Sequence, residues 1–220
     1  MRRWLRDNGL TLALLGLFAF SLVGQALAGW RMELTGAETP GRPPDSLAAY
    51  LAGGAFLSAL FENWESEFLQ MWAFVMLTAY LYQRGSEESK DPDRPAPQDR
   101  DPALDAGDPD APWPVRAGGP ARALYSHSLG LALLALFVAS FVLHWLNSTR
   151  HAAREALARG APAPSPADRL VDPAFWFESF QNWQSEFLST AVLIVLAIYL
   201  RERRSPESKP VGAPQARTGD

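Results

Sequence analysis

The chain of 220 residues has 20% charged residues, a formal net charge of -4 and no cysteine. The lack of cysteine excludes a disulfide framework and a thiolate metal site, and a negative charge without a basic, aromatic-rich stripe argues against nucleic-acid binding. The mean hydropathy of -0.09 is that of a soluble protein. That average conceals four apolar runs, which are separated by stretches rich in proline and aspartate.

The first apolar run, from Leu10 to Leu27, contains no charged residue. It predicts a membrane-spanning helix over residues 10–29, because a spanning helix needs about 17–25 largely apolar residues. The basic start of the chain and Ala26-Leu27-Ala28 also give this segment the pattern of a cleavable signal peptide. We expect it to be retained as a helix, because a closely similar run recurs in mid-chain at residues 129–146.

The second apolar run, from Phe68 to Leu81, has only fourteen residues. It can span a membrane only if the preceding motif FENWESEFL, residues 61–69, belongs to the same helix, so we predict a span over residues 61–82. The loop before it, residues 43–61, suits a short amphipathic helix in the membrane interface.

The central segment, residues 91–120, is predicted to be a disordered cytoplasmic linker. Asp91 to Pro114 contains seven aspartates and seven prolines, so it cannot bury enough apolar surface to offset its chain entropy. Its acidic residues lack the glycine and glutamate spacing of an EF-hand calcium loop. The C-terminal residues 210–220 are predicted to be a disordered tail.

The second half of the chain repeats the first at a constant shift of 119 residues. FQNWQSEFL at residues 180–188 shares seven of nine residues with the motif at 61–69, and residues 129–146 share ten of eighteen with residues 10–27. SEESK at residues 86–90 likewise matches SPESK at residues 205–209. A fixed period this long indicates a repeated structural unit.

The shift of 119 predicts two further spans, over residues 128–147 and 180–200, and a second interfacial helix within residues 166–180. We therefore divide the chain into a first repeat, residues 1–90, and a second repeat, residues 121–209. The predicted fold is an all-α integral membrane protein with four transmembrane helices, built as two tandem two-helix repeats with short interfacial helices in the outer loops.

The repeated motif puts polar residues on one face of the second helix in each repeat, because asparagine, serine and glutamate follow at i, i+3 and i+4. A rise of 1.5 Å per residue places Glu67 and Glu186 about 21 Å above the cytoplasmic boundary, and Gln25 and His144 about 22 Å above it. The sequence therefore predicts a polar cluster in the outer leaflet, made of Glu67, Glu186, His144, Gln25, Asn63, Asn182, Ser66 and Ser185.

Two interpretations of this polar cluster stay open. In the structural one, asparagine and serine cap the helix, the acidic residues lie near the positive end of its dipole, and Trp64 and Trp183 anchor it in the interface. In the functional one, the glutamates form a site for a proton, an ion or a small solute, with His144 as a proton acceptor or a metal ligand. We expect neither a resident metal nor a cofactor.

The distribution of lysine and arginine predicts cytoplasmic termini. The N-terminal tail has three, the central loop six and the C-terminal tail five, whereas the other two loops together have six. Basic residues accumulate on the cytoplasmic side of membrane proteins, so both termini and the linker are expected there.

The segments GQALAGWR, FENWESEFLQM, FWFESFQNWQSEFL and SPESKP resemble a family of bacterial four-helix membrane proteins that is grouped as a domain of unknown function. The resemblance covers nearly the whole chain apart from the linker. It implies the four-helix fold and a location in the bacterial cytoplasmic membrane, and it implies no activity.

The sequence does not indicate an enzyme, since it has no Ser-His-Asp pattern in a recognisable context, no glycine-rich phosphate loop and no HExxH motif. We expect a multi-pass membrane protein that binds or conducts a proton, an ion or a small solute at the polar cluster. The alternative is a structural scaffold that recruits partners through its cytoplasmic linker and tails. The expected partners are the lipid bilayer and a second copy of the chain or another membrane protein, and not nucleic acid.

Overall fold

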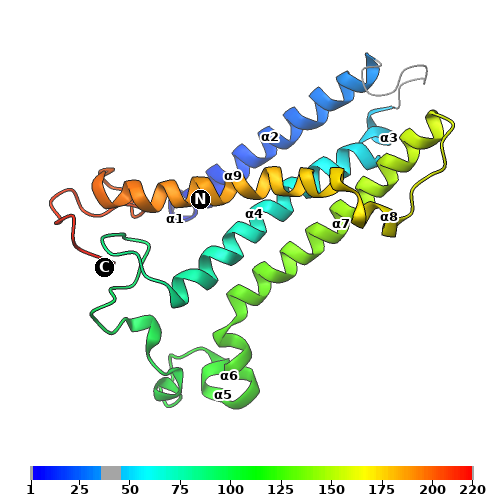
Figure 1. Ribbon diagram of the computed structural model, residues 1–220. Coiled ribbons are helices and arrows are strands. Elements are labelled where there is room, and N and C mark those ends of the chain that lie inside the picture. Colours follow the sequence, from blue (N-terminus) through cyan, green and yellow to red (C-terminus); the bar gives the residue numbers. More distant parts are fainter. Residues whose placement is uncertain (1, 36–45, 220) are drawn as a thin grey trace. The chain divides into compact units, whose positions relative to one another are not determined.

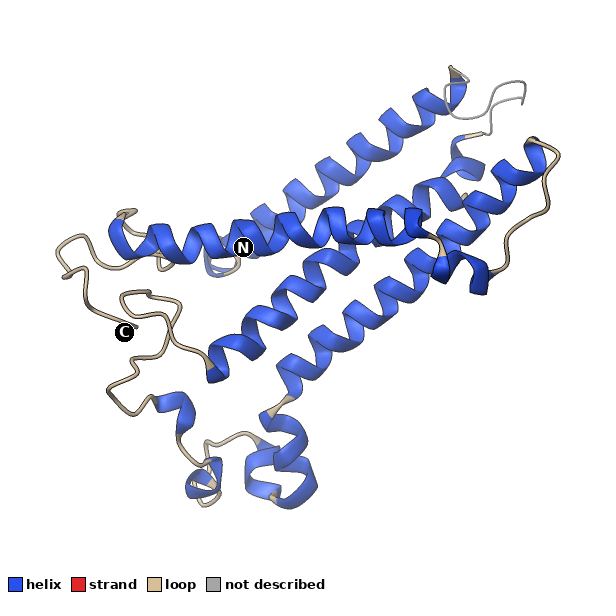
Figure 2. Cartoon of the chain, in the orientation of Figure 1, coloured by secondary structure: helices blue, strands red, loops and turns tan. Residues whose placement is uncertain are grey.

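The computed structural model describes residues 2–35 and 46–219, and in this part of the chain it has helices and turns and no strand (Figures 1 and 2). Part of one predicted interfacial segment, residues 43–45, and residue 220 of the predicted tail lie outside the described residues. The long helices are α2 (Gly9–Leu34), α4 (Gly54–Tyr80), α7 (Ser128–Ala158) and α9 (Pro173–Tyr199). The short ones are α1 (Arg2–Asp7), α3 (Leu47–Leu51), α5 (Trp113–Ala117), α6 (Gly119–Ser126), α8 (Pro166–Val171), η1 (Pro97–Asp99) and η2 (Pro102–Asp105).

Each long helix overlaps one predicted span. However, α4 and α9 begin seven residues early, at 54 rather than 61 and at 173 rather than 180, and they end at 80 rather than 82 and at 199 rather than 200. The helices found where interfacial helices were predicted are correspondingly short, with five residues in α3 and six in α8. In α9 the early start has a local cause: Pro173 suits a first helical position, and the Asp172 carboxylate accepts the Ala174 N–H at 2.9 Å. Both ends of α9 lie 119 residues after those of α4.

Among the described helices, α2 and α7 are long and apolar enough to cross a membrane. None of the residues of α2 is buried, and Leu10 and Phe20 are 75% and 77% exposed. A helix that is apolar on all sides is stable in lipid rather than in water, so these two helices suggest membrane association. α2 is near the N-terminus, where a signal sequence has the same features.

The chain forms two compact units that do not coincide with the predicted repeats. Unit 1 comprises Met1–Phe61 and Val142–Phe175, and unit 2 comprises Glu62–Phe141 and Trp176–Asp220. The boundary passes through α4, α7 and α9, so each unit contains residues from both halves of the sequence. The division into repeats therefore stays a prediction from the sequence.

In unit 1, the C-terminal part of α7 contacts the first turn of α4 and the short helix α8. A Cβ atom on Gly54 would lie 2.7 Å from the His151 backbone nitrogen and 2.8 Å from the Asn147 carbonyl oxygen, so the two backbones approach closely at this glycine. On the α8 side, the Trp145 indole N–H donates to the Pro166 carbonyl at 2.8 Å.

Arg169 fixes α8 to α7 within unit 1. This arginine is 7% exposed and donates from Nε to the Ser148 hydroxyl at 2.9 Å and from Nη1 to the Asp172 carboxylate at 2.5 Å. Its guanidinium lies 5.7 Å from the centroid of the Phe175 ring. Arg169 was counted as a loop arginine in the topology prediction, and the structure shows that it is a buried structural residue.

In unit 2, aromatic contacts join α7 to α9. The ring centroids of Phe137 and Trp183 are 6.2 Å apart, and those of Phe141 and Trp176 are 6.1 Å apart. Such pairs add about 0.5–1.5 kcal/mol each beyond the area they bury.

The segment predicted as a linker, residues 91–120, contains η1, η2 and α5 and buries only Val115. Proline stands at an N-terminal position of each of these three elements. Local capping therefore accounts for the elements, and the disorder of this segment in solution stays a prediction.

Candidate binding site

A buried carboxylate joins α4 to α9 in unit 2. Glu65 on α4 is 0% exposed, and its Oε1 accepts the Ser179 hydroxyl at 2.9 Å and the Trp183 indole N–H at 3.3 Å. Ser179 is also 0% exposed. Burying a charge is costly unless hydrogen bonds compensate it, so these donors are needed to keep Glu65 between the helices.

Two further hydrogen bonds follow along the same pair of helices. The Asn182 amide donates to the Glu62 carboxylate at 2.5 Å, and the Gln70 amide donates to the Thr190 hydroxyl at 2.7 Å. Both pairs are 120 residues apart in the sequence. The residue number of the α9 partner rises with the residue number on α4. The two helices therefore run in the same direction in unit 2.

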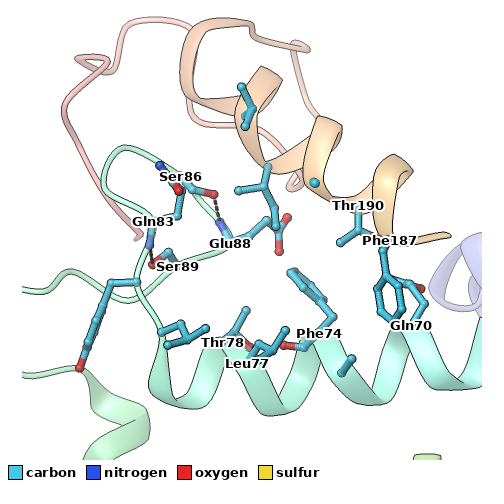
Figure 3. A pocket seen from close by; sticks show the side chains of 16 residues that line it. Gln70, Phe74, Leu77, Thr78, Gln83, Ser86, Glu88, Ser89, Phe187 and Thr190 are labelled. Atoms are coloured by element: carbon cyan, nitrogen blue, oxygen red, sulfur yellow. Dashed lines mark hydrogen bonds between the residues drawn. The ribbon is translucent and has the colours of Figure 1, made fainter. Parts of the chain in front are cut away.

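From Gln70 and Thr190 onwards, α4, α9 and the loop after α4 line an open cavity of about 440 Å³ (Figure 3). Phe74, Leu77 and Ile194 contribute to its apolar wall, whereas Ser86, Glu88 and Ser89 line it from the loop. Figure 3 shows the Glu88 carboxylate among these lining side chains. The volume lies within the range of about 300–1,000 Å³ that is typical of small-molecule sites.

The loops that follow α4 and α9 have the same hydrogen bonds, built from the SEESK and SPESK segments. In each loop the first serine accepts the backbone N–H two residues later, and the second serine accepts the backbone N–H six residues earlier. The bonds are Glu88 to Ser86 (3.2 Å), Gln83 to Ser89 (2.8 Å), Glu207 to Ser205 (3.2 Å) and Glu202 to Ser208 (2.9 Å).

The equivalent glutamates of these two loops, Glu88 and Glu207, are hydrogen-bonded through their side chains. Burial raises the pKa of Glu88 above its ordinary 4.5, and the hydrogen bond with Glu207 and the charges of Glu207 and Glu87 raise it further. Two carboxyl groups this close hold a proton more tightly than either would alone. The cavity therefore has a protonatable acid pair at its loop end.

The lysines of the two loops differ. The Lys209 ammonium is 0% exposed and donates to the carbonyls of Gly85, Gln215 and Arg217 at 2.6, 2.7 and 3.1 Å. Lys90 instead donates to the Ala79 carbonyl at 2.9 Å and to Asp99 at 2.6 Å. Lys209 thus ties the segment predicted as a disordered tail to the loop after α4.

The whole chain, residues 1–220, matches a protein family described as "Domain of unknown function (DUF6766)". The chain belongs to the DUF6766 family. This confirms the resemblance to a family of unknown function. No curated protein and no solved structure matches the chain.

Unit 2 of this DUF6766 chain contains six of the eight residues of the predicted polar cluster, all except Gln25 and His144. Glu67 is exposed and Glu186 is half-buried. Ser66 and Ser185 each donate to a carbonyl of their own helix, three residues earlier, at 2.8 Å. Asn182 is bonded to Glu62, which was not predicted.

Gln25 and His144 lie in unit 1, so the single eight-residue cluster stays a prediction. His144 is 0% exposed, and its ring centroid is 4.8 Å from that of Phe175. This is a packing environment. Of the two predicted interfacial anchors, Trp183 also bonds Glu65 and packs against Phe180 at 5.3 Å, while Trp64 is half-buried.

Sequence reasoning missed Glu62 and Glu65 in the DUF6766 chain because it favoured positions that are identical in the two repeats. These are the only two positions at which the nine-residue motifs differ, with Gln181 and Gln184 as their counterparts. Both glutamines are exposed. The sequence does contain a sign of their role: two glutamates of the first motif are glutamines in the second. Only the first copy therefore has carboxylate acceptors at these positions.

Proposed function

We propose that this DUF6766 protein is a four-span protein of the bacterial cytoplasmic membrane that binds a small solute in the cavity between α4 and α9. The observation that carries the proposal is the 440 Å³ cavity with an apolar wall and a polar end. A concave, mostly apolar site with a few converging polar groups is the usual form of a small-molecule site.

Four spans are supported by the length of α4 and α9 and by the hydrogen bonds between their polar residues. Each has 27 residues, or about 40 Å at 1.5 Å per residue, which exceeds a hydrocarbon core of about 30 Å. Two of the three glutamates of α4, Glu62 and Glu65, accept hydrogen bonds from α9. Polar residues in membrane helices typically face other helices in this way.

The binding proposal moves the site from the predicted outer-leaflet cluster to the other end of the same helix pair. Glu65 and Glu62 then hold α4 and α9 together, and the space beyond Gln70 and Thr190 is left for a ligand. The scaffold alternative has less support, because Lys209 binds part of the C-terminal tail to the chain's own loop.

Photolabelling tests the proposal. The protein in phosphatidylcholine nanodiscs is irradiated with a long-chain alcohol that bears a diazirine, and the labelled peptides are identified by mass spectrometry. We expect saturable labelling of residues 70–82 and 187–195, displaced by excess unlabelled alcohol. Ala73→Trp, which fills the cavity, should lower this labelling about tenfold, equivalent to about 1.4 kcal/mol.

Ala79→Trp is the matched control, because Ala79 is an exposed alanine of the same helix that does not line the cavity. It should label like the wild type. Non-saturable labelling, or equal loss in both variants, would show that the probe only dissolves in the surrounding lipid, and the binding proposal would be abandoned.

A further inference from the structure

The loop end of the cavity carries a concentration of acidic groups. Glu88 lines the cavity, is hydrogen-bonded to Glu207 from the C-terminal segment, and is next to Glu87 in its own loop. The lysines that follow in each loop are engaged elsewhere, with Lys90 bonded to Ala79 and Asp99, and Lys209 bonded to three carbonyls. The polar end of the cavity therefore presents the Glu88 carboxyl group, with Glu207 bonded to it, beside an apolar wall.

We propose that the ligand of this cavity is an amphipathic monovalent cation, with an apolar body against Phe74, Leu77 and Ile194 and an ammonium group on the Glu88–Glu207 pair. This inference rests on the proposed function, and it adds the chemical class of the ligand. An apolar body gains free energy from the burial of its surface. Charge-assisted hydrogen bonds from N–H groups to carboxylate oxygens are about twice as strong as neutral ones, so they select an amine over an alcohol of equal size.

Binding of the cation is coupled to release of a proton. Burial and hydrogen bonding raise the pKa of Glu88, so the paired carboxyls hold one proton at a pH below that raised pKa. When the ammonium group arrives, the carboxyl O–H bond breaks, the proton leaves to water, and an ammonium N–H replaces it as the donor between the two carboxylates. One positive charge enters and one leaves, so the charge of the site does not change.

Because cation binding releases a proton, the apparent affinity for the amine should fall as the pH is lowered. The charges that act on Glu88 are those of Glu207 and Glu87, and both favour the protonated form of Glu88. Lowering the pH through the raised pKa protonates the pair, and the apparent affinity for the amine then falls by up to about tenfold per pH unit. The affinity for an uncharged alcohol should not follow this profile.

The experiment compares two diazirine probes with the same alkyl chain, one ending in a primary amine and the other in a hydroxyl. Wild-type protein in phosphatidylcholine nanodiscs should reach half-saturation at about tenfold lower concentration of the amine, a difference of about 1.4 kcal/mol. Glu88→Gln and the double variant Glu88→Gln/Glu207→Gln should abolish the preference. Glu202→Gln is the control, because Glu202 is exposed and contributes only its backbone to the loop.

The outcomes separate the two proposals. Saturable labelling by both probes with no preference for the amine would overturn the cation proposal and leave the binding site. Absence of saturable labelling by either probe would overturn both. An amine preference that persists in the double variant, or a phospholipid that native mass spectrometry finds bound and that the amine does not displace, would overturn the cation proposal.

Discussion

At the residue scale, Glu65 and Glu67 are two positions apart and have opposite environments. Glu65 is fully buried against α9, and Glu67 is exposed. A separation of two residues turns a helical side chain to the far side of the helix, so only one of the two can face α9. The repeated sequence favours Glu67 because Glu186 matches it, whereas packing in unit 2 selects Glu65.

Replacement of Glu65 by alanine tests this assignment. Glu65→Ala leaves the Ser179 hydroxyl and the Trp183 indole N–H without their acceptor. We expect the free energy of unfolding to fall by about 1–3 kcal/mol, measured by denaturant titration in mixed micelles. Glu67→Ala should change it by less than about 0.5 kcal/mol. Equal effects of the two substitutions would contradict the buried assignment.

At the element scale, α4 and α9 end in the same way but begin differently. The loops after α4 and α9 have matching serine hydrogen bonds. The serines accept backbone N–H groups in the turn after each helix, which is a common role for this residue type. The beginnings of α4 and α9 differ, because α4 starts at a glycine pressed against α7 and α9 starts at a proline.

The glycine at the start of α4 provides a prediction for unit 1. In Gly54→Ala the new methyl group would meet backbone atoms of α7 at 2.7 and 2.8 Å, and backbone atoms cannot yield as a flexible side chain can. We expect a loss of about 1–3 kcal/mol in the free energy of unfolding, measured in the same micelles. Gly16→Ala is the control, because nothing lies within 4 Å of its added Cβ; it should be neutral or stabilising by up to about 1 kcal/mol. A loss of similar size in Gly16→Ala would show that helical glycine itself, and not the contact, is responsible.

At the scale of the whole molecule, the number of spans determines which loops share a side of the membrane. α2 and α7 are apolar enough to cross it, and the proposal adds α4 and α9. With four spans, the loop between α4 and α7 lies on the side of both termini. With only α2 and α7 crossing, that loop would lie opposite the N-terminus.

Fusions to alkaline phosphatase, which is active only outside the cytoplasm, test the topology. A fusion after Arg159 should be active, and fusions after Arg100 and Arg217 inactive, because the loops with more lysine and arginine stay in the cytoplasm. Expression of each fusion is checked by immunoblot. Activity after Arg100 would contradict the proposed orientation and the four-span arrangement.

The sequence by itself determined the long helices, the family and the equivalence of positions 119 apart, because apolar runs and repeated motifs are local properties that one chain displays directly. It predicted a polar cluster that includes Glu67 and Glu186, and this cluster stays a prediction. Only the tertiary structure decided that Glu62 and Glu65 bond α9, that Lys209 is buried, and that a cavity lies beside Glu88. Each of these depends on which face of one helix meets another, and a difference of two residues along a helix changes that face while leaving the apolar pattern almost unaltered.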